Sequence, residues 1–222
     1  MSRSSYMLVA VLPLAFVAAC GDKTTDLFPG GGERVRFANA TNTTVSVVND
    51  GVLFTSNTGI GFGGTTSCIT VDASNPSALV FTNTSTGATI VGFTPTLTPG
   101  GSFTIIAYIG ATGTTQFAIL NDAFTPTSGS AGVRTFNAAS GSGTVTIVSN
   151  GTALPGTSAT FGTASSFVSV PSGTDAITVD SGTNQIVDAG PLTFSSGQTS
   201  TLVVGPAAAG TTTLRSFTTN GC

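Results

Sequence analysis

Residues 44–51 read TVSVVNDG and residues 144–151 read TVTIVSNG, so one short pattern occurs twice along the chain. In each copy, successive residues are expected to point to opposite faces of a strand, and most of them are β-branched. An Asp-Gly or Asn-Gly dipeptide follows. This pattern is typical of a strand that ends in a tight turn, because both residues of such a dipeptide tolerate positive φ. The two segments therefore predict two copies of one β-rich unit.

The similarity extends well beyond these two segments, at offsets that stay between 97 and 100 residues. It includes Val35-Arg36 with Val133-Arg134, Asn39-Ala40 with Asn137-Ala138, and Phe62-Gly63 with Phe161-Gly162. Such constant offsets predict two domains of about ninety residues each. We place them at residues 34–124 and 132–222, with a linker at 125–131 that reads TPTSGSA.

The fold class follows from the spacing of the short β-branched segments. They recur every 8–12 residues, with Gly, Asn, Asp, Ser or Pro between them, and no segment after Cys20 keeps a helical period for three turns. This spacing suits a sandwich of about seven strands per domain. We therefore expect an all-β protein with two tandem immunoglobulin-like or transthyretin-like β-sandwich domains.

The composition excludes several classes of chemistry. Threonine (41), serine (25) and glycine (29) supply 95 of the 222 residues, whereas only six residues are basic and nine acidic, and histidine and tryptophan are absent. Without an imidazole there is no Ser-His-Asp triad and no histidine-ligated zinc. A chain with a net charge of −3 also has too few cations to bind a nucleic-acid backbone. We expect no enzyme activity, no cofactor, no metal site and no nucleic-acid partner.

The first 22 residues indicate export. An apolar run of thirteen residues, Met7 to Ala19, is too short to span a bilayer and predicts a signal peptide at residues 1–19. The following VAACG, residues 17–21, resembles the lipobox of bacterial lipoproteins, which implies cleavage before Cys20 and acylation of that cysteine. The alternative is an ordinary signal peptide with an incidental cysteine. Residues 20–33 would then form a lipidated, flexible tether.

The predicted location is the bacterial outer membrane, on its periplasmic or outward-facing side. In lipoproteins of this kind, an aspartate directly after the lipidated cysteine favours the inner membrane. Here that position is Gly21, and Asp22 comes one residue later. The membrane contact would be made by the lipid on Cys20.

The quoted segments also carry a family resemblance. VRFANAT at 35–41, TVSVVNDG at 44–51 and LTPGGSFTIIAYIG at 97–110 resemble the family called domain of unknown function 4397. The resemblance covers Arg34 to Asp122 well and Val133 to Phe217 more loosely. Asn39 and Asn137 stand where this family often has histidine. The family implies a secreted or cell-surface sandwich module, and it supplies no catalytic residues.

One acidic motif invites a catalytic interpretation. Residues 180–183 read DSGT, which matches the D-S/T-G-S/T signature of aspartic proteases, but such an enzyme needs two aspartates that share one proton. The equivalent segment of the first repeat, residues 84–87, reads TSTG, so the structural interpretation of a turn is favoured. The remaining acids in the two repeats lie in expected turns or at strand ends without a calcium-loop spacing: Asp50, Asp72, Asp122, Asp175 and Asp188.

Two residue pairs recur at matching positions of the repeats, Arg36 with Arg134 and Phe62 with Phe161. We expect them to maintain the fold rather than to bind a ligand, with each arginine on a strand face and each phenylalanine in a core.

Cys68 and Cys222 remain once Cys20 is lipidated, and two cysteines in an exported chain predict a disulfide. This bridge would tie the C-terminus of the second domain to the first. The alternative is a buried Cys68, whose counterpart in the second repeat is Phe167, with Cys222 left free.

These observations favour a non-catalytic structural, adhesion or protein-binding role at the cell envelope. An exposed aromatic or apolar patch, on a sandwich face or at the domain junction, would mark an adhesion surface. A glycan-binding module is the alternative, although sugars usually stack on Trp or Tyr, and only Tyr108 remains after removal of Tyr6. A hydrolase that uses aspartates alone is a remote third hypothesis.

Overall fold

The protein is described by a computed structural model, which places residues 32–49, 52–53, 55, 59–71 and 79–222. Within these ranges every regular element is a strand, and no helix is long and apolar enough to cross a membrane. The signal peptide, Cys20, Asp50 and Asp72 lie outside the described residues.

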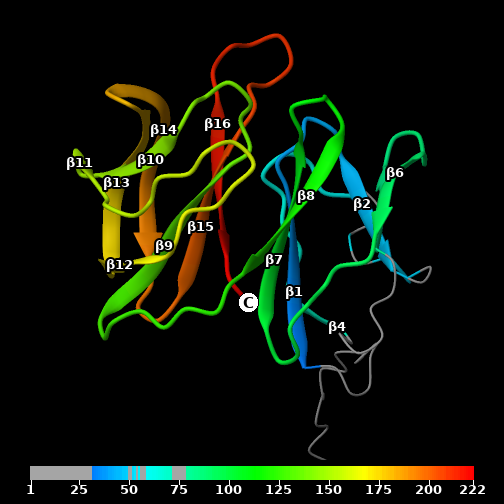
Figure 1. The fold of residues 1–222 in the computed structure, drawn as a ribbon, viewed down its shortest axis with the longest axis horizontal. Helices are drawn as coiled ribbons and strands as arrows, with labels where there is room; N and C mark the ends of the chain where they lie inside the picture. Colours follow the sequence, from blue (N-terminus) through cyan, green and yellow to red (C-terminus); the bar gives the residue numbers. More distant parts are fainter. Residues whose placement is uncertain (1–31, 50–51, 54, 56–58, 72–78) are drawn as a thin grey trace, which may run out of the picture.

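Domain 1 contains strands β1 to β8 in two four-stranded sheets (Figure 1). The first sheet has the order β4-β1-β7-β8 and faces domain 2, and we call it the inner sheet; the other, β3-β2-β5-β6, is the outer sheet. The strands are β1 (Glu33–Asn39), β2 (Val45–Asn49), β3 (Val52–Leu53), β4 (Ile69–Val71), β5 (Leu79–Asn83), β6 (Thr89–Phe93), β7 (Ser102–Ile109) and β8 (Thr115–Asn121).

Domain 2 repeats this arrangement strand for strand, with an inner sheet β12-β9-β15-β16 and an outer sheet β11-β10-β13-β14. The predicted linker at residues 125–131 overlaps the segment between β8 and β9. The strands are β9 (Ser130–Asn137), β10 (Val145–Ser149), β11 (Thr152–Ala153), β12 (Val168–Pro171), β13 (Gly173–Ser181), β14 (Asn184–Phe194), β15 (Thr199–Gly205) and β16 (Arg215–Asn220).

The all-β class and the two tandem sandwiches are confirmed, and two details differ from the sequence prediction. The described residues form eight strands in each domain rather than about seven, because the two-residue strands β3 and β11 pair on the hairpin turns. Each inner sheet also contains a parallel pair, β1 with β7 and β9 with β15, among otherwise antiparallel strands. Parallel neighbours are typically buried on both faces, and β7, β9 and β15 are buried along almost their whole length, whereas Arg34 of β1 is exposed.

The described hydrophobic residues form three clusters, which explain why the four sheets stack as layers. One cluster fills the sandwich of domain 1 around Phe37 and Phe81, and another fills domain 2 around Ile147 and Leu202. The third, around Phe136, lies between the two inner sheets. The layers therefore follow in the order outer, inner, inner, outer (Figure 1).

The predicted tight turn of domain 2 is present. Asn150 and Gly151 have φ values of 49° and 78°, and they connect β10 to β11. The side chain of Asn150 also binds Asp175 and the backbone of Ala176, so the turn is tied to the neighbouring strand β13.

Candidate functional site: the junction between the domains

The junction is a sheet-on-sheet contact with its own hydrophobic centre. Ile106 and Tyr108 of β7 meet Phe136 of β9 and Val203 of β15, and all four side chains are buried. The rings of Tyr108 and Phe136 are 5.4 Å apart and packed edge to face. Alternation along these strands sends one set of side chains into each sandwich and the other set into the junction.

The arginines that recur in the sequence cross this junction reciprocally. Arg36 of β1 donates from Nη1 to the backbone oxygen of Asn220, at 2.5 Å. Arg134 of β9 donates from Nη1 to the backbone oxygen of Asn121, at 2.6 Å. Asn121 and Asn220 are the last residues of β8 and β16 and occupy equivalent register positions. The two domains thus contact each other through the same surface, as in a twofold dimer.

The recurring phenylalanines, Phe62 and Phe161, also contact the opposite domain at equivalent places. Phe62 of domain 1 packs edge to face against Phe217 of β16, and it also covers Gly205, where a Cβ atom would overlap its ring. Phe161 of domain 2 packs against Tyr108, which is the register equivalent of Gly205. The prediction that these rings belong to the domain cores was wrong, since each is half-buried and contacts the opposite domain.

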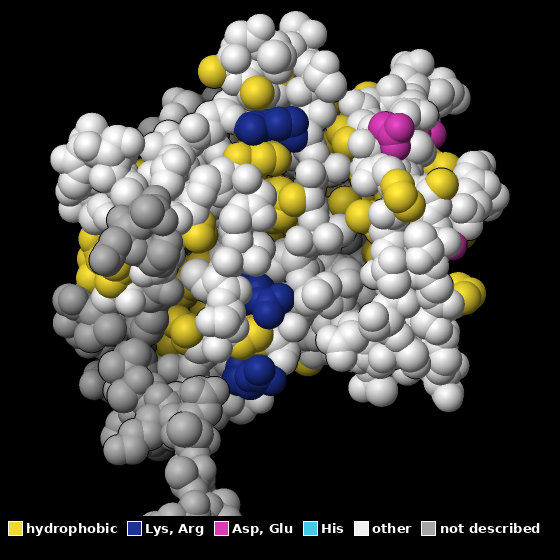
Figure 2. Space-filling view, turned by 180° about the vertical axis from the view of Figure 1, so that it is seen from behind, with side chains coloured by type: hydrophobic (Ala, Val, Ile, Leu, Met, Phe, Trp, Pro, Cys, Tyr) yellow, Lys and Arg dark blue, Asp and Glu magenta, His cyan; other side chains and the backbone are white. Residues whose placement is uncertain are grey.

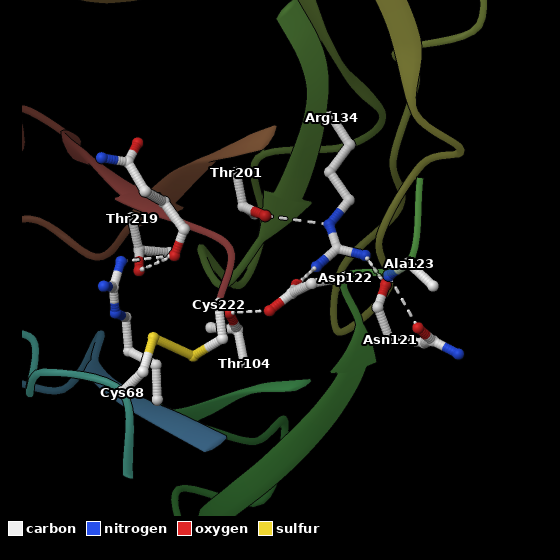
Figure 3. Close-up of polar contacts among 11 residues, drawn as sticks. Cys68, Thr104, Asn121, Asp122, Ala123, Arg134, Thr201, Thr219 and Cys222 are labelled. Atoms are coloured by element: carbon white, nitrogen blue, oxygen red, sulfur yellow. Dashed lines mark hydrogen bonds and ion pairs between the residues drawn. A yellow bond between two sulfur atoms is a disulfide. The ribbon is translucent and has the colours of Figure 1, made fainter. Parts of the chain in front are cut away.

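Asp122 breaks the symmetry of the junction. It follows Asn121, whereas Gly221 follows the equivalent Asn220. Its carboxylate accepts hydrogen bonds from Arg134 Nη2, at 2.5 Å, and from the Thr104 hydroxyl, at 2.7 Å (Figure 3). The side chains of Arg134 and Asp122 are only 5% and 1% exposed, so this is a buried ion pair between the domains.

Arg36 and Arg134 also differ in their hydrogen bonds. Arg134 Nε donates to the Thr201 hydroxyl, at 2.9 Å. The register equivalent of Thr201 is Thr104, whose hydroxyl is already donated to Asp122. Among the described residues, the buried Nε of Arg36 has no hydrogen-bond partner. Arg134 therefore uses all three guanidinium nitrogens in hydrogen bonds.

Burial dominates the titration of this network. It raises the pKa of Asp122, and the lowering effects of Arg134, the Thr104 hydroxyl and the Cys222 backbone amide offset only part of that. It likewise lowers the pKa of Arg134, although Asp122 acts in the opposite direction. The pKa of Arg36 is also lowered, first by burial and further by Arg34, against the effect of Asp122.

The predicted disulfide is confirmed, since Cys68 and Cys222 are bonded and link the two domains (Figure 3). Cys68 precedes β4 just as Phe167 precedes β12. At the equivalent place across the junction, Phe167 stacks on Phe124, with ring centroids 5.1 Å apart, and the Arg134 guanidinium lies 4.2 Å from the Phe167 ring centre. One half of the junction is therefore closed covalently, and the other by a stack of two rings and a cation.

The other acidic candidates have local structural contacts. Asp175 accepts hydrogen bonds from Ser149 and Asn150, and Asp188 accepts one from the backbone of Gly190. Asp180 of the DSGT segment lies in β13 of the outer sheet, with one buried carboxylate oxygen that has no hydrogen-bond partner in the described part of the chain. In the described part of the chain, no three His, Cys, Asp or Glu residues gather as a metal site would require.

Asn39 and Asn137, which stand where the family often has histidine, are buried and hydrogen-bond to neighbouring loops. The Asn39 side chain donates to the backbone oxygens of Thr43 and Ile60, and Asn137 binds the equivalent loop through Gly143 and Ala159. Each holds the segment after the first strand of its domain against the inner sheet.

The polar surface carries charges of opposite sign on different parts. On the face drawn in Figure 2, basic side chains lie along the domain boundary, and acidic ones lie apart from them over domain 2. Arg34 donates to the backbone oxygen of Cys222, and Arg215 lies over the Phe62 ring and donates to the side chain of Asn42. Among the described large hydrophobic residues only Leu53 and Ile119 are exposed, so the apolar adhesion patch is not found there.

A groove opens across the junction beside the ion pair and the disulfide. Its volume is about 700 Å³. Domain 1 contributes Ser102 and residues 122–124, the linker contributes Thr125, and domain 2 contributes residues 197–199 and 221–222. Sequence reasoning missed this groove because its walls come from turns and strand ends that only the docking of the domains brings together.

A family profile described as domain of unknown function (DUF4397) matches residues 33–148 and 131–221. The chain belongs to this family. No curated protein matches the sequence. Among solved structures, a carbohydrate-binding module of family CBM26 from Eubacterium rectale Amy13K, in complex with maltoheptaose, aligns over 85% of this chain and 95% of its own. The identity is 11% and the TM-score is 0.28, which is too low to transfer a ligand.

Proposed function

We propose that this DUF4397 protein is a lipid-anchored, non-catalytic binding component of the bacterial envelope, held at the outer membrane through Cys20. The non-catalytic role is supported by what the charged side chains and cysteines at the junction do. Arg36, Arg134, Asp122 and the two bonded cysteines all hold the domains together. A catalytic acid or base instead needs access to substrate and a pKa near the working pH.

The lipid anchor is supported by the VAACG segment directly after an apolar run. Two or three acyl chains would hold the protein stably, whereas one chain alone binds only marginally. The disulfide agrees with an oxidising compartment outside the cytoplasm.

Labelling of producing cells with an alkyne fatty acid tests the anchor. The wild-type protein should carry the label and fractionate with outer membranes, and a Cys20→Ser variant should carry none. A labelled Cys20→Ser protein, or an unlabelled wild type, would contradict lipidation. Recovery of envelope proteins on immobilised mature chain, compared with a reduced and alkylated sample, tests the binding role.

A further inference from the structure

The groove across the junction has the size and position of a ligand site. Its volume of about 700 Å³ falls within the roughly 300–1,000 Å³ of small-molecule sites, which occur preferentially at domain interfaces. Its lining includes equivalent residues of the two domains, Ser102 with Thr199 and Asp122 with Gly221. It therefore lies across the axis that relates the domains.

The lining is polar, and none of its side chains carries an available charge. Its only charged side chain is Asp122, which is 1% exposed and paired with Arg134. The basic residues Arg34, Arg36 and Arg215 are not part of the lining. An anionic ligand would find no free basic side chain in the lining, and a cationic ligand would find no free acidic side chain.

The groove also has unused hydrogen-bonding capacity. Among the described residues, none hydrogen-bonds to the side chains of Ser102, Thr125 or Gln198. Hydroxyls both donate and accept, and the Gln198 amide offers one acceptor and two donors. Gly197 adds no side chain, and no other atom lies within 4 Å of the position that a Cβ would take there, so a ligand can approach its backbone closely. The half-buried ring of Phe124 supplies an apolar wall.

This lining does not suit an extended peptide that binds by adding a strand. Such binding requires a free strand edge, but the two strands that begin in the groove are β7, at Ser102, and β15, at Thr199. Both strands are paired on both sides. Donor–acceptor side chains beside one aromatic ring instead match a molecule with many hydroxyls and apolar C–H faces.

We propose that the junction groove binds a neutral oligosaccharide, with Gln198, Ser102 and Thr125 as its hydrogen-bonding side chains and Phe124 as its apolar contact. The proposal rests on the binding role proposed above and names the ligand class for it. Because both domains line the groove, the site exists only while the domains are docked.

Calorimetric titration tests this with the mature chain in a detergent whose head group is not a sugar. The probes are maltoheptaose, cellohexaose, chitohexaose and mannohexaose, with oligogalacturonate as a charged comparison. At least one neutral probe should bind with a Kd below about 1 mM, and oligogalacturonate should bind more weakly. Gln198→Ala should weaken that binding about tenfold, because one or two hydrogen bonds are lost.

Gln185→Ala is the matched control, since Gln185 is an exposed glutamine of β14 outside the groove and should leave binding unchanged. The proposal is overturned if no neutral probe binds, if only oligogalacturonate binds, or if the two glutamine variants behave alike. Acylation of Cys20 and recovery of envelope proteins are measured separately, so those results remain interpretable if the sugars fail to bind.

Discussion

Arg36 and Arg134 reach across the domain junction in opposite directions, and each donates to the backbone oxygen at the end of the other domain's last strand. They also differ, because among the described residues Arg134 forms an ion pair with a carboxylate and Arg36 does not. This combination of equivalent geometry and unequal partners allows one arginine to serve as the control for the other.

Replacement of Arg134 by Met should destabilise the protein by about 3–5 kcal/mol, because it leaves the Asp122 carboxylate buried without its cation. The same change at Arg36 removes one hydrogen bond to a backbone oxygen and should cost about 1 kcal/mol. Urea unfolding of both variants at neutral pH measures the difference. Equal losses of unfolding free energy in the two variants would show that the buried ion pair adds no stability of its own.

Asp122 should also give the stability a specific pH dependence. Its pKa is raised in the folded protein, so the folded state binds the proton more tightly than the unfolded state, where the pKa is about 3.9. The stability linked to this proton is fully present below the unfolded pKa and is lost as the pH rises through the folded one. The unfolding free energy of wild type minus that of Asp122→Asn should therefore fall from pH 4 upward. A difference that rises over this range would contradict the sign.

Phe62 and Gly205 should behave as a coupled pair across the junction. A methyl group at Gly205 overlaps the Phe62 ring, so Gly205→Ala should cost about 1–3 kcal/mol by overpacking. In a Phe62→Ala background the ring is absent, and the same change should cost almost nothing. A double-mutant cycle of urea unfolding measures this coupling. Additive losses would mean that the two residues do not touch in solution.

Loss of the disulfide should weaken the protein without separating the domains. Cys68 and Cys222 are 154 residues apart in sequence, and removal of such a crosslink costs about 2–5 kcal/mol. The buried cluster around Phe136 remains in a Cys68→Ser/Cys222→Ser variant and should keep the inner sheets in contact. Small-angle scattering should give the same radius of gyration for variant and wild type, and an expanded variant would show that the bond alone maintains docking.

The sequence predicted the repeated sandwich and the disulfide because both depend on local or countable features. The alternation at residues 44–48 and the Asn150-Gly151 dipeptide reflect backbone preferences, and two cysteines allow one pairing. The parallel pairing of β1 with β7 was missed, since it joins strands that are distant in sequence. A recurring Phe62 also looks the same in the sequence whether it fills its own domain or contacts the other.

The role of Asp122 shows the same limit. In the sequence it is one acid among several at strand ends, and its partner Arg134 lies in the other domain. Only the docking of the inner sheets brings the two together and forms the groove beside them. An asymmetry was nevertheless visible, because the Asn121-Asp122 dipeptide of the first repeat corresponds to Asn220-Gly221 in the second.

We expect the reciprocal junction to hold the two domains as one rigid unit. Amide ¹⁵N relaxation of the mature chain measures it directly, by giving a rotational correlation time for each domain. The strands β1 to β8 and β9 to β16 should report one common value, that of a single particle containing both domains, before and after reduction of the disulfide. Two different values, each typical of a separately tumbling domain, would contradict the account.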